Sequence, residues 1–356
     1  MSLRFVLSWV LAPVLVIGAA LTGGYWVSAR AGDTRSSLTA ALDALPDDTL
    51  VAGFTNWSSI RKQLDLGDAS STAGRAALND DASLLDLSTR SLIGRSVEEM
   101  HQSFGWSVAD LDWEVYGQAA DGAAMVARFD DSVSLADVRG SLRKLGYTQD
   151  GRVWTLSASS SLTGELATSL ASIAIIPGER LVVAADRPTY VLTVLQVIDR
   201  DMPSLLTVRS AAQVAGALVG TDSALVQGGA LACEDTSLAK QPADVQAQAS
   251  AAVARAGDLA NLTFAGRGLT DVSKGKQEVA FVMGFDSPSV AAAQLTARKA
   301  LAKGPLIGGS GRIEDSLQLT SSRVDGATAT LRFAHDPVSA AYMGGIGPLL
   351  FASCPG

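Results

Sequence analysis

Residues 124–130 read AMVARFD, and the same kind of run returns at residues 279–286 as VAFVMGFD. Both runs are apolar almost throughout and close on Phe-Asp, which is typical of a buried strand that ends at a turn. Each is followed by a helical pattern, at 134–145 in the first case and at 289–301 in the second. Two further strand-like runs follow each helix, and we expect these at 152–156 and 180–186, and at 311–319 and 327–334.

The order strand, helix, strand, strand, helix therefore occurs twice, about 150 residues apart, and predicts an internal duplication of a β-α-β-β-α unit. The alternative is that a chain mixing strands and helices shows this order by chance. A true repeat gives two layered units, each an antiparallel sheet with helices on one face, so the expected fold class is α+β. We place the first α+β unit at residues 32–233 and the second at 234–356, with the polar stretch 234–244 as linker.

A long apolar run precedes these units: Phe5 to Val27 reads FVLSWVLAPVLVIGAALTGGYWV and holds no ionisable side chain. About 20 such residues suffice to cross a bilayer as a helix, and aromatic residues near both ends suit the membrane interfaces. We therefore expect residues 1–31 to be an N-terminal membrane anchor, a transmembrane helix that is not removed. The alternative is a cleaved signal peptide with Ala29-Arg30-Ala31 as the cleavage site, although the apolar run exceeds the usual core of about 7–15 residues.

The composition points to export. The net charge of -8 argues against nucleic acid as a partner and against binding to anionic lipids through a polybasic segment. High Ala, Val, Gly, Asp and Arg content with little Lys resembles that of exported, membrane-anchored proteins of high-GC Gram-positive bacteria. This resemblance implies a single-pass protein of the cell membrane, with a cytoplasmic N-terminus and an extracytoplasmic C-terminal domain, and it brings no functional residues with it.

The chain has two cysteines, Cys233 and Cys354. In an exported protein an isolated pair is most simply a disulfide, and this one would tie the C-terminal tail back to the region where the first unit ends. The alternative is two free buried thiols. A loop of about 120 residues closed in this way would stabilise the fold by at most roughly 4–5 kcal/mol on the chain-entropy model.

The residue types that carry most enzyme chemistry are sparse. His101 and His335 are the only histidines, far apart in the sequence, and oxidised cysteines leave no Cys/His zinc cluster. Ser141-Leu-Arg-Lys144 and Ser237-Leu-Ala-Lys240 match the S-x-x-K pattern of penicillin-recognising enzymes, but the S-D-N and K-T-G companions are missing. The sequence therefore predicts no catalytic residue, no metal ligand and no cofactor.

The most aromatic segment of the exported region contains a candidate binding surface. Asp110 and Asp112 are flanked by Trp106 and Trp113, and these four side chains could line a groove for a carbohydrate or a peptide. The alternative is that the two tryptophans simply pack in the core.

Two functions remain open. The first is a non-enzymatic, membrane-anchored extracytoplasmic protein that acts as a scaffold or accessory subunit of a cell-envelope complex, with a protein partner. The second is a carrier or sensor that holds a lipid or other hydrophobic ligand between helices and sheet, suggested by the apolar segments 162–173 and 190–198. A cavity of several hundred Å³ would favour the ligand, and a filled core with an exposed apolar patch would favour the partner.

Overall fold

The computed structural model describes residues 36–160, 162–273, 276–336, 340–344 and 347–355. The expected membrane anchor, Phe5–Val27, lies outside the described residues. Among the helices that are described, none is both long enough and apolar enough to cross a membrane.

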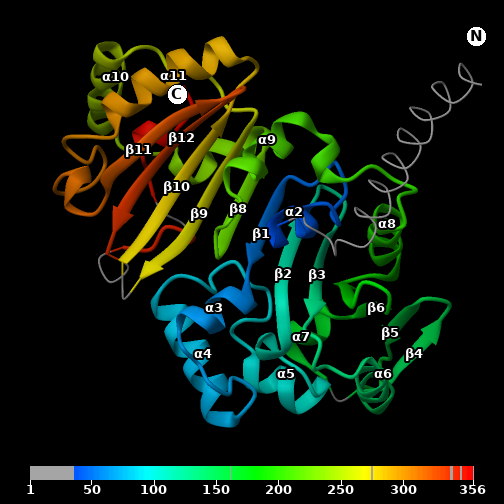
Figure 1. Cartoon of the computed structure of the whole chain (residues 1–356). Helices are drawn as coiled ribbons and strands as arrows, with labels where there is room; N and C mark the ends of the chain where they lie inside the picture. The colour runs from blue at the N-terminus through cyan, green and yellow to red at the C-terminus, as the bar shows by residue number, and fades with distance from the viewer. Residues whose placement is uncertain (1–35, 161, 274–275, 337–339, 345–346, 356) are drawn as a thin grey trace, which may run out of the picture. The chain divides into compact units, whose positions relative to one another are not determined.

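Twelve strands of the described residues join into one antiparallel sheet, which confirms the α+β class (Figure 1). Every neighbouring pair in this sheet is antiparallel. In order across the sheet, the strands are β11 (Gln318–Asp325), β12 (Thr328–His335), β10 (Lys276–Gly284), β9 (Phe264–Ser273), β8 (Ser223–Gly228), β1 (Val51–Thr55), β2 (Leu111–Gln118), β3 (Ala123–Phe129), β7 (Leu181–Ala185), β6 (Ser172–Ile176), β5 (Val153–Leu156) and β4 (Tyr147–Asp150).

Helices cover both faces of the sheet, not one face as expected from the sequence. The physical reason lies in strands such as β3, whose alternate residues Val126 and Ala127 are both buried and belong to cores on opposite faces. The first face packs against α2 (Ser37–Leu42), α8 (Pro188–Ile198) and α9 (Arg209–Ala217). The second face packs against α3 (Trp57–Gln63), α4 (Thr72–Leu84), α5 (Val97–Phe104), α6 (Leu135–Lys144), α7 (Gly164–Ser169), α10 (Ala243–Ala256) and α11 (Pro288–Leu301).

The strand order follows the same path in the two halves of the sheet. It runs β1-β2-β3-β7-β6 in one half and β8-β9-β10-β12-β11 in the other, and β5 and β4 extend the first half only. The halves meet where β1 pairs with β8, with Gly53 opposite Leu225. In each half the helix after the Phe-Asp run starts at a serine cap: Ser134 Oγ accepts from Asp137 N, and Ser287 Oγ accepts from Val290 N.

On the first face, α9 approaches β9 closely because the strand carries glycine there. A Cβ built on Gly266 would lie 2.6 Å from Val214 Cγ1 and 2.7 Å from Leu218 Cδ1, closer than real carbon contacts allow. Glycine at this position therefore sets the distance between the helix and the sheet.

Replacing Gly266 with valine is expected to lower the free energy of unfolding by about 1–3 kcal/mol, because the added methyl groups overpack the contact with α9. Gly216 provides the control: it is exposed on α9 with open space around it, so Gly216→Ala is expected to stabilise by about 0.5–1 kcal/mol. Urea unfolding followed by tryptophan fluorescence measures both. A Gly266→Val protein as stable as the unmodified chain would show that α9 can move away without loss.

Candidate functional site

The two tryptophans of the candidate binding surface lie in different cores. Trp106 is 2 % exposed and packs edge-on against Phe129, with ring centroids 5.0 Å apart, in the core of the second face. Trp113 is 3 % exposed and belongs to the core of the first face. The pair therefore lines no common groove, and both side chains act in packing.

The two carboxylates beside them are engaged locally. Asp110 Oδ2 accepts from Ser107 N at 2.8 Å as part of a capping box, and Asp112 lies 3.5 Å from Arg128 Nε. Asp110 also borders an open polar depression of about 330 Å³ with Arg61 and Asp130. Arg61 donates to the carbonyls of Val108 and Leu111, and burial lowers its pKa. Arg61 is thus engaged in holding the backbone together, and it lines this depression without being free to bind a ligand there.

The residues checked for catalysis are not brought together. Ser237 Oγ accepts from Ala239 N at 3.1 Å, whereas Lys240 faces Glu234 at 3.7 Å. His101 lies on α5, and His335 is buried at the end of β12, where burial lowers its pKa. Within the described part of the chain, no group of three or more His, Cys, Asp or Glu side chains could hold a metal ion.

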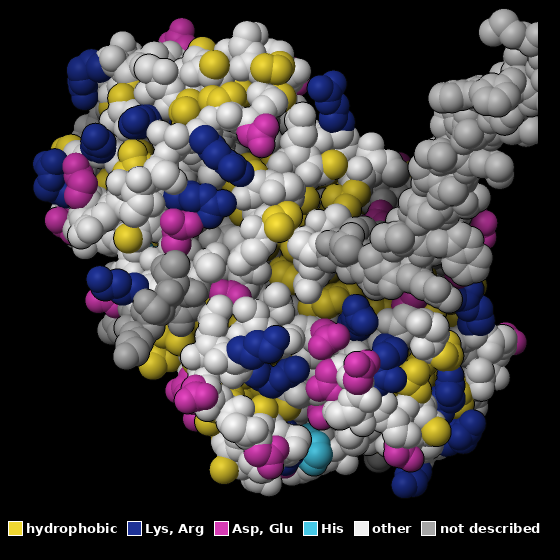
Figure 2. All heavy atoms as spheres, viewed as in Figure 1, with side chains coloured by type: hydrophobic (Ala, Val, Ile, Leu, Met, Phe, Trp, Pro, Cys, Tyr) yellow, Lys and Arg dark blue, Asp and Glu magenta, His cyan; other side chains and the backbone are white. Residues whose placement is uncertain are grey.

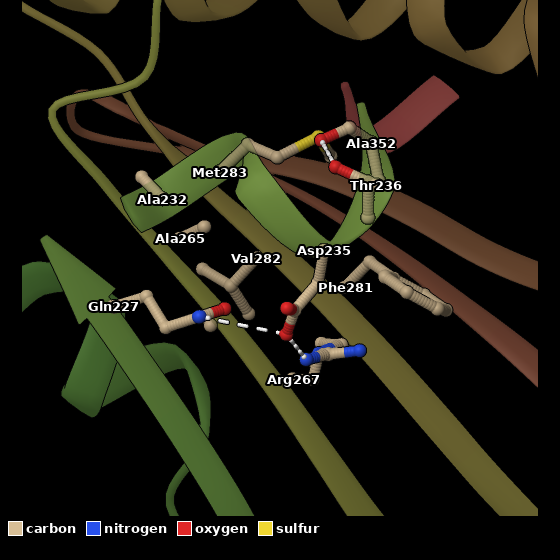
Figure 3. Close-up of a pocket in the computed structure, with 11 residues that line it drawn as sticks. Gln227, Ala232, Asp235, Thr236, Ala265, Arg267, Phe281, Val282, Met283 and Ala352 are labelled. Atoms are coloured by element: carbon tan, nitrogen blue, oxygen red, sulfur yellow. Dashed lines mark hydrogen bonds and ion pairs between the residues drawn. The ribbon is translucent and has the colours of Figure 1, made fainter. Parts of the chain in front are cut away.

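An ion pair beside β9 joins the buried Arg267 to the half-buried Asp235. Arg267 Nη2 donates to Asp235 Oδ2 at 2.6 Å, and Gln227 Nε2 approaches the same oxygen at 3.5 Å (Figure 3). Burial lowers the pKa of Arg267 to about 10. The space beside the pair is about 20 Å³, room for roughly one water. The pair therefore fixes the 3-10 helix Gly229–Thr236 to β9 and offers no ligand pocket.

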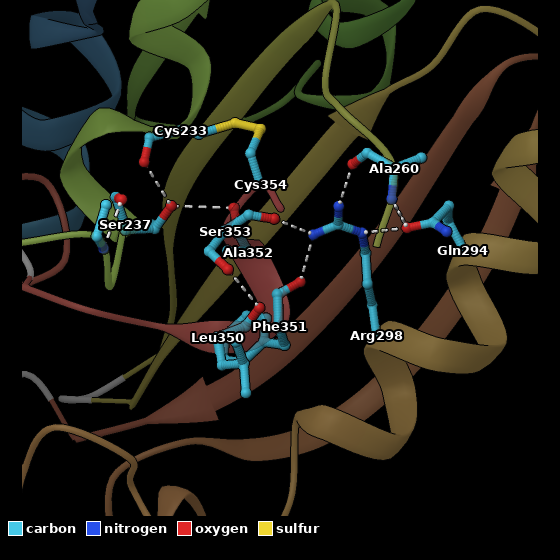
Figure 4. Close-up of a disulfide and its surroundings, with 12 residues drawn as sticks. Cys233, Ser237, Ala260, Gln294, Arg298, Leu350, Phe351, Ala352, Ser353 and Cys354 are labelled. Atoms are coloured by element: carbon cyan, nitrogen blue, oxygen red, sulfur yellow. Dashed lines mark hydrogen bonds between the residues drawn. A yellow bond between two sulfur atoms is a disulfide. The ribbon is translucent and has the colours of Figure 1, made fainter. Parts of the chain in front are cut away.

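The C-terminal tail is fastened to the second face by the disulfide that the sequence predicts. Cys233 and Cys354 are joined, with Cα atoms 5.5 Å apart, across 121 residues (Figure 4). Thr236 Oγ1 donates to the carbonyl of Ala352 at 3.0 Å. Phe351 is 0 % exposed and its ring lies 5.1 Å from that of Phe281, so the tail contributes to the core.

Arg298 also holds the same tail in place. Its guanidinium donates to the carbonyl oxygens of Phe351 and Ser353, both at 2.9 Å, and to that of Ala260 at 3.0 Å (Figure 4). The side chain is 0 % exposed, and burial lowers its pKa to about 10. Backbone carbonyls thus solvate this cation in place of water.

Two cavities lie on the two flanks of α10. The first, about 500 Å³, lies between α10, α11 and the segment 303–313, and we call it the α10–α11 groove. The second, about 570 Å³, lies between α10 and the C-terminal tail, and we call it the α10–tail groove. In the space-filling view, hydrophobic side chains gather over α11 with Lys and Arg side chains around them (Figure 2).

Helix α10 shapes both grooves because its side chains are small. Ala251, Ala252, Arg255 and Ala256 line the α10–α11 groove, whereas a second stripe lines the other, and each stripe follows the three- and four-residue spacing of a helix face. Only Ala249 of this helix is buried. The second stripe consists of Gln246, Ala249, Ser250, Val253 and Ala254.

Neither groove was predicted from the sequence. The available signal was volume: an alanine-rich helix beside leucine and isoleucine neighbours leaves space at its flanks. Leu350 borders both grooves, so the tail and α10 together form their shared wall.

Comparison with known proteins gives no assignment. No family model matches the chain, and no curated protein matches it. Among solved structures, crystal forms I and IV of TP0453 match with TM-scores of 0.40 and 0.42, at 10% and 9% sequence identity. These matches cover 84% and 85% of this chain and 93% and 96% of the other. Similarity at this level supports no conclusion about function.

Proposed function

We propose that this chain is a membrane-anchored extracytoplasmic protein that binds a hydrophobic ligand beside α10 and catalyses no reaction. The observation that carries the proposal is the pair of grooves, about 500 and 570 Å³, on the flanks of one helix. Ligand sites in proteins commonly measure about 300–1,000 Å³ and are lined mainly by apolar side chains. Most of the residues that line each groove are apolar.

The location rests on two observations. Phe5–Val27 has the length and composition of a membrane-spanning helix. The disulfide supports an oxidising compartment, since such bonds are rare where thiols are kept reduced. Together these support a cytoplasmic N-terminus and a folded region on the far side of the cell membrane.

A scaffold or accessory subunit of a cell-envelope complex is the second candidate. The observation that favours it is β11, an eight-residue strand at one end of the described sheet whose side chains are mostly exposed. Such an edge can pair with a strand of another protein. A large apolar patch would have been a stronger sign, but the exposed large apolar side chains are scattered over separate elements. They are Leu50, Leu84, Leu192, Val219 and Val324.

We also infer that the two halves of the sheet arose by duplication. The shared strand path and the helix α6 or α11 inserted after the Phe-Asp run support this inference. On this inference the boundary between the halves lies before α9, earlier than the division at Cys233 and Glu234 expected from the sequence. The ligand grooves then belong to the second half alone, where α10 follows β8.

Native mass spectrometry of the full chain, extracted from its membrane in mild detergent, tests the ligand proposal. We expect the chain to carry a lipid, and we expect Ala251→Trp/Ala254→Trp to lose it, because each new indole fills one groove. Both alanines are exposed on α10, so the fold should tolerate the change. Ala293→Trp, on the exposed side of α11 and away from both grooves, is the control.

Three other outcomes would count against the ligand. A bare monomer, or equal lipid content in the double variant and the control, would refute binding in the grooves. A stoichiometric protein partner without lipid would favour the scaffold instead.

A further inference from the structure

We infer that the ligand is an anionic amphiphile with a single acyl chain, bound in the α10–α11 groove with its headgroup at Arg255 and Lys303. This inference rests on the proposed function and adds the groove, the charge of the headgroup and the residues that recognise it. The two grooves differ in the charge of the residues that line them.

The α10–α11 groove is lined by two cations and no carboxylate. Arg255 and Lys303 are its only charged lining residues, whereas the α10–tail groove has Asp258 and no cation. The whole chain carries 36 acidic and 28 basic residues, so a wall with only positive charge runs against its composition. Opposite charge at the rim attracts an anionic ligand and raises its local concentration.

The two cations are available to a ligand. Both side chains are exposed, and neither forms an ion pair with another residue in the described ranges. Arg255 lies in the last turn of α10, and Lys303 follows the C-cap residue of α11, Ala302. The helix dipoles favour cations at these ends, which explains their placement without a ligand but not why both face one groove.

The acidic side chains nearest in sequence do not line this groove. Asp258 follows Arg255 by three residues but lines the α10–tail groove, and the nearest one to Lys303 is Glu314. Glu314 accepts from Gly304 N at 3.0 Å and from Arg312 Nη2 at 3.3 Å. Hydrogen bonds from its own backbone N–H, from Gly304 N and from Arg312 lower the pKa of Glu314, so the carboxylate is ionised and already partnered. Glu314 therefore has partners other than Lys303, and the Lys303 ammonium can pair with a ligand in the groove.

The rest of the groove suits a hydrocarbon chain. Its apolar lining includes Leu301, Leu306, Ile307, Ile313 and Leu350, and Leu301 and Ile313 are buried. Moving the methylenes of an acyl chain from water onto such a surface stabilises the complex. An apolar wall with cations at the rim fits an acyl chain that carries a carboxylate or phosphate head.

Photolabelling in membranes tests the inference with two probes that share a chain. Full-length protein is exposed to a diazirine fatty acid and to the matching diazirine fatty alcohol, and labelled peptides are mapped. We expect the acid to label α10, α11 and residues 303–313. Arg255→Gln/Lys303→Gln should reduce labelling by the acid about tenfold, since two exposed charge contacts are lost, and leave labelling by the alcohol unchanged.

Lys144→Gln/Arg323→Gln is the matched control, because it removes two exposed positive charges away from the groove. It should leave labelling by the acid unchanged. Equal labelling of the groove by acid and alcohol would overturn the inference and leave the proposed function standing. Labelling confined to the α10–tail groove would overturn it likewise. No labelling of α10 by either probe would refute both.

Discussion

The variant Arg298→Met is expected to unfold with a free energy about 3–5 kcal/mol below that of the unmodified protein. The methionine fills similar space but leaves three carbonyl oxygens, those of Ala260, Phe351 and Ser353, without the donor that now satisfies them at 2.9 to 3.0 Å. A buried acceptor without a partner costs about 1–3 kcal/mol. The tail should therefore loosen from α11.

The pH dependence of this loss follows from the arginine. Burial lowers the folded-state pKa of Arg298 to about 10, so the folded state holds this proton less tightly than the unfolded state. The unfolded state therefore binds more protons than the folded state only above about pH 10. In that range the contribution of this group makes the free energy of unfolding rise with pH, and below it the contribution is constant. Between pH 6 and pH 8 both states are protonated, and the loss in Arg298→Met should be the same at both.

Urea unfolding monitored by tryptophan fluorescence at the two pH values measures this prediction. Lys299→Met is the control, because Lys299 is the next residue on the same helix and is exposed; its effect should stay within about 0.5 kcal/mol. An Arg298→Met protein that unfolds at the same urea concentration as the control would show that the tail carbonyls find other donors.

Much of the fold could be predicted from the sequence because the key strands are apolar almost throughout. The run at 124–130 is β3, Ala123–Phe129, and the run at 279–286 largely matches β10, Lys276–Gly284. The same continuity also indicates that both faces of these strands are buried. A strand in which polar and apolar residues alternate has one solvent-exposed face. These strands have none, which is why helices lie on both sides of the sheet.

The joining of the two halves could not be predicted. It depends on pairing between two short strands, β1 and β8, that lie far apart in the sequence. The cysteine pair was easier to predict, because a chain with two cysteines can form only one internal disulfide.

The candidate site failed for a local reason. Trp106 and Trp113 are close in sequence, but a 3-10 turn at Val108–Asp110 and a register shift between Leu111 and Trp113 separate them. Alternation along a strand therefore cannot tell which face each tryptophan reaches. The grooves beside α10 depend on volumes that only packed neighbours define, so the sequence indicated the helix and not the space around it.

Removing the disulfide with Cys233→Ala/Cys354→Ala is expected to lower the free energy of unfolding by about 2–5 kcal/mol. The bond closes a loop of 121 residues, and its loss returns that freedom to the unfolded chain. Dithiothreitol should lower the stability of the unmodified protein by the same amount and leave the variant unchanged. Reduction without any effect on the urea midpoint would show that the bond constrains little.

The disulfide and Arg298 both hold the same short C-terminal segment. The losses in the free energy of unfolding caused by removing each of them should therefore not add. Cys354 is covalently held, and Arg298 binds the carbonyls of the residues just before it. Once both are lost, the tail can detach locally while the sheet stays folded, and the further loss is limited to what the tail contributes. The combined loss in the triple variant should fall short of the sum of the separate losses by at least about 1 kcal/mol. Strict additivity in this double-mutant cycle would mean that the disulfide and Arg298 stabilise different parts of the fold.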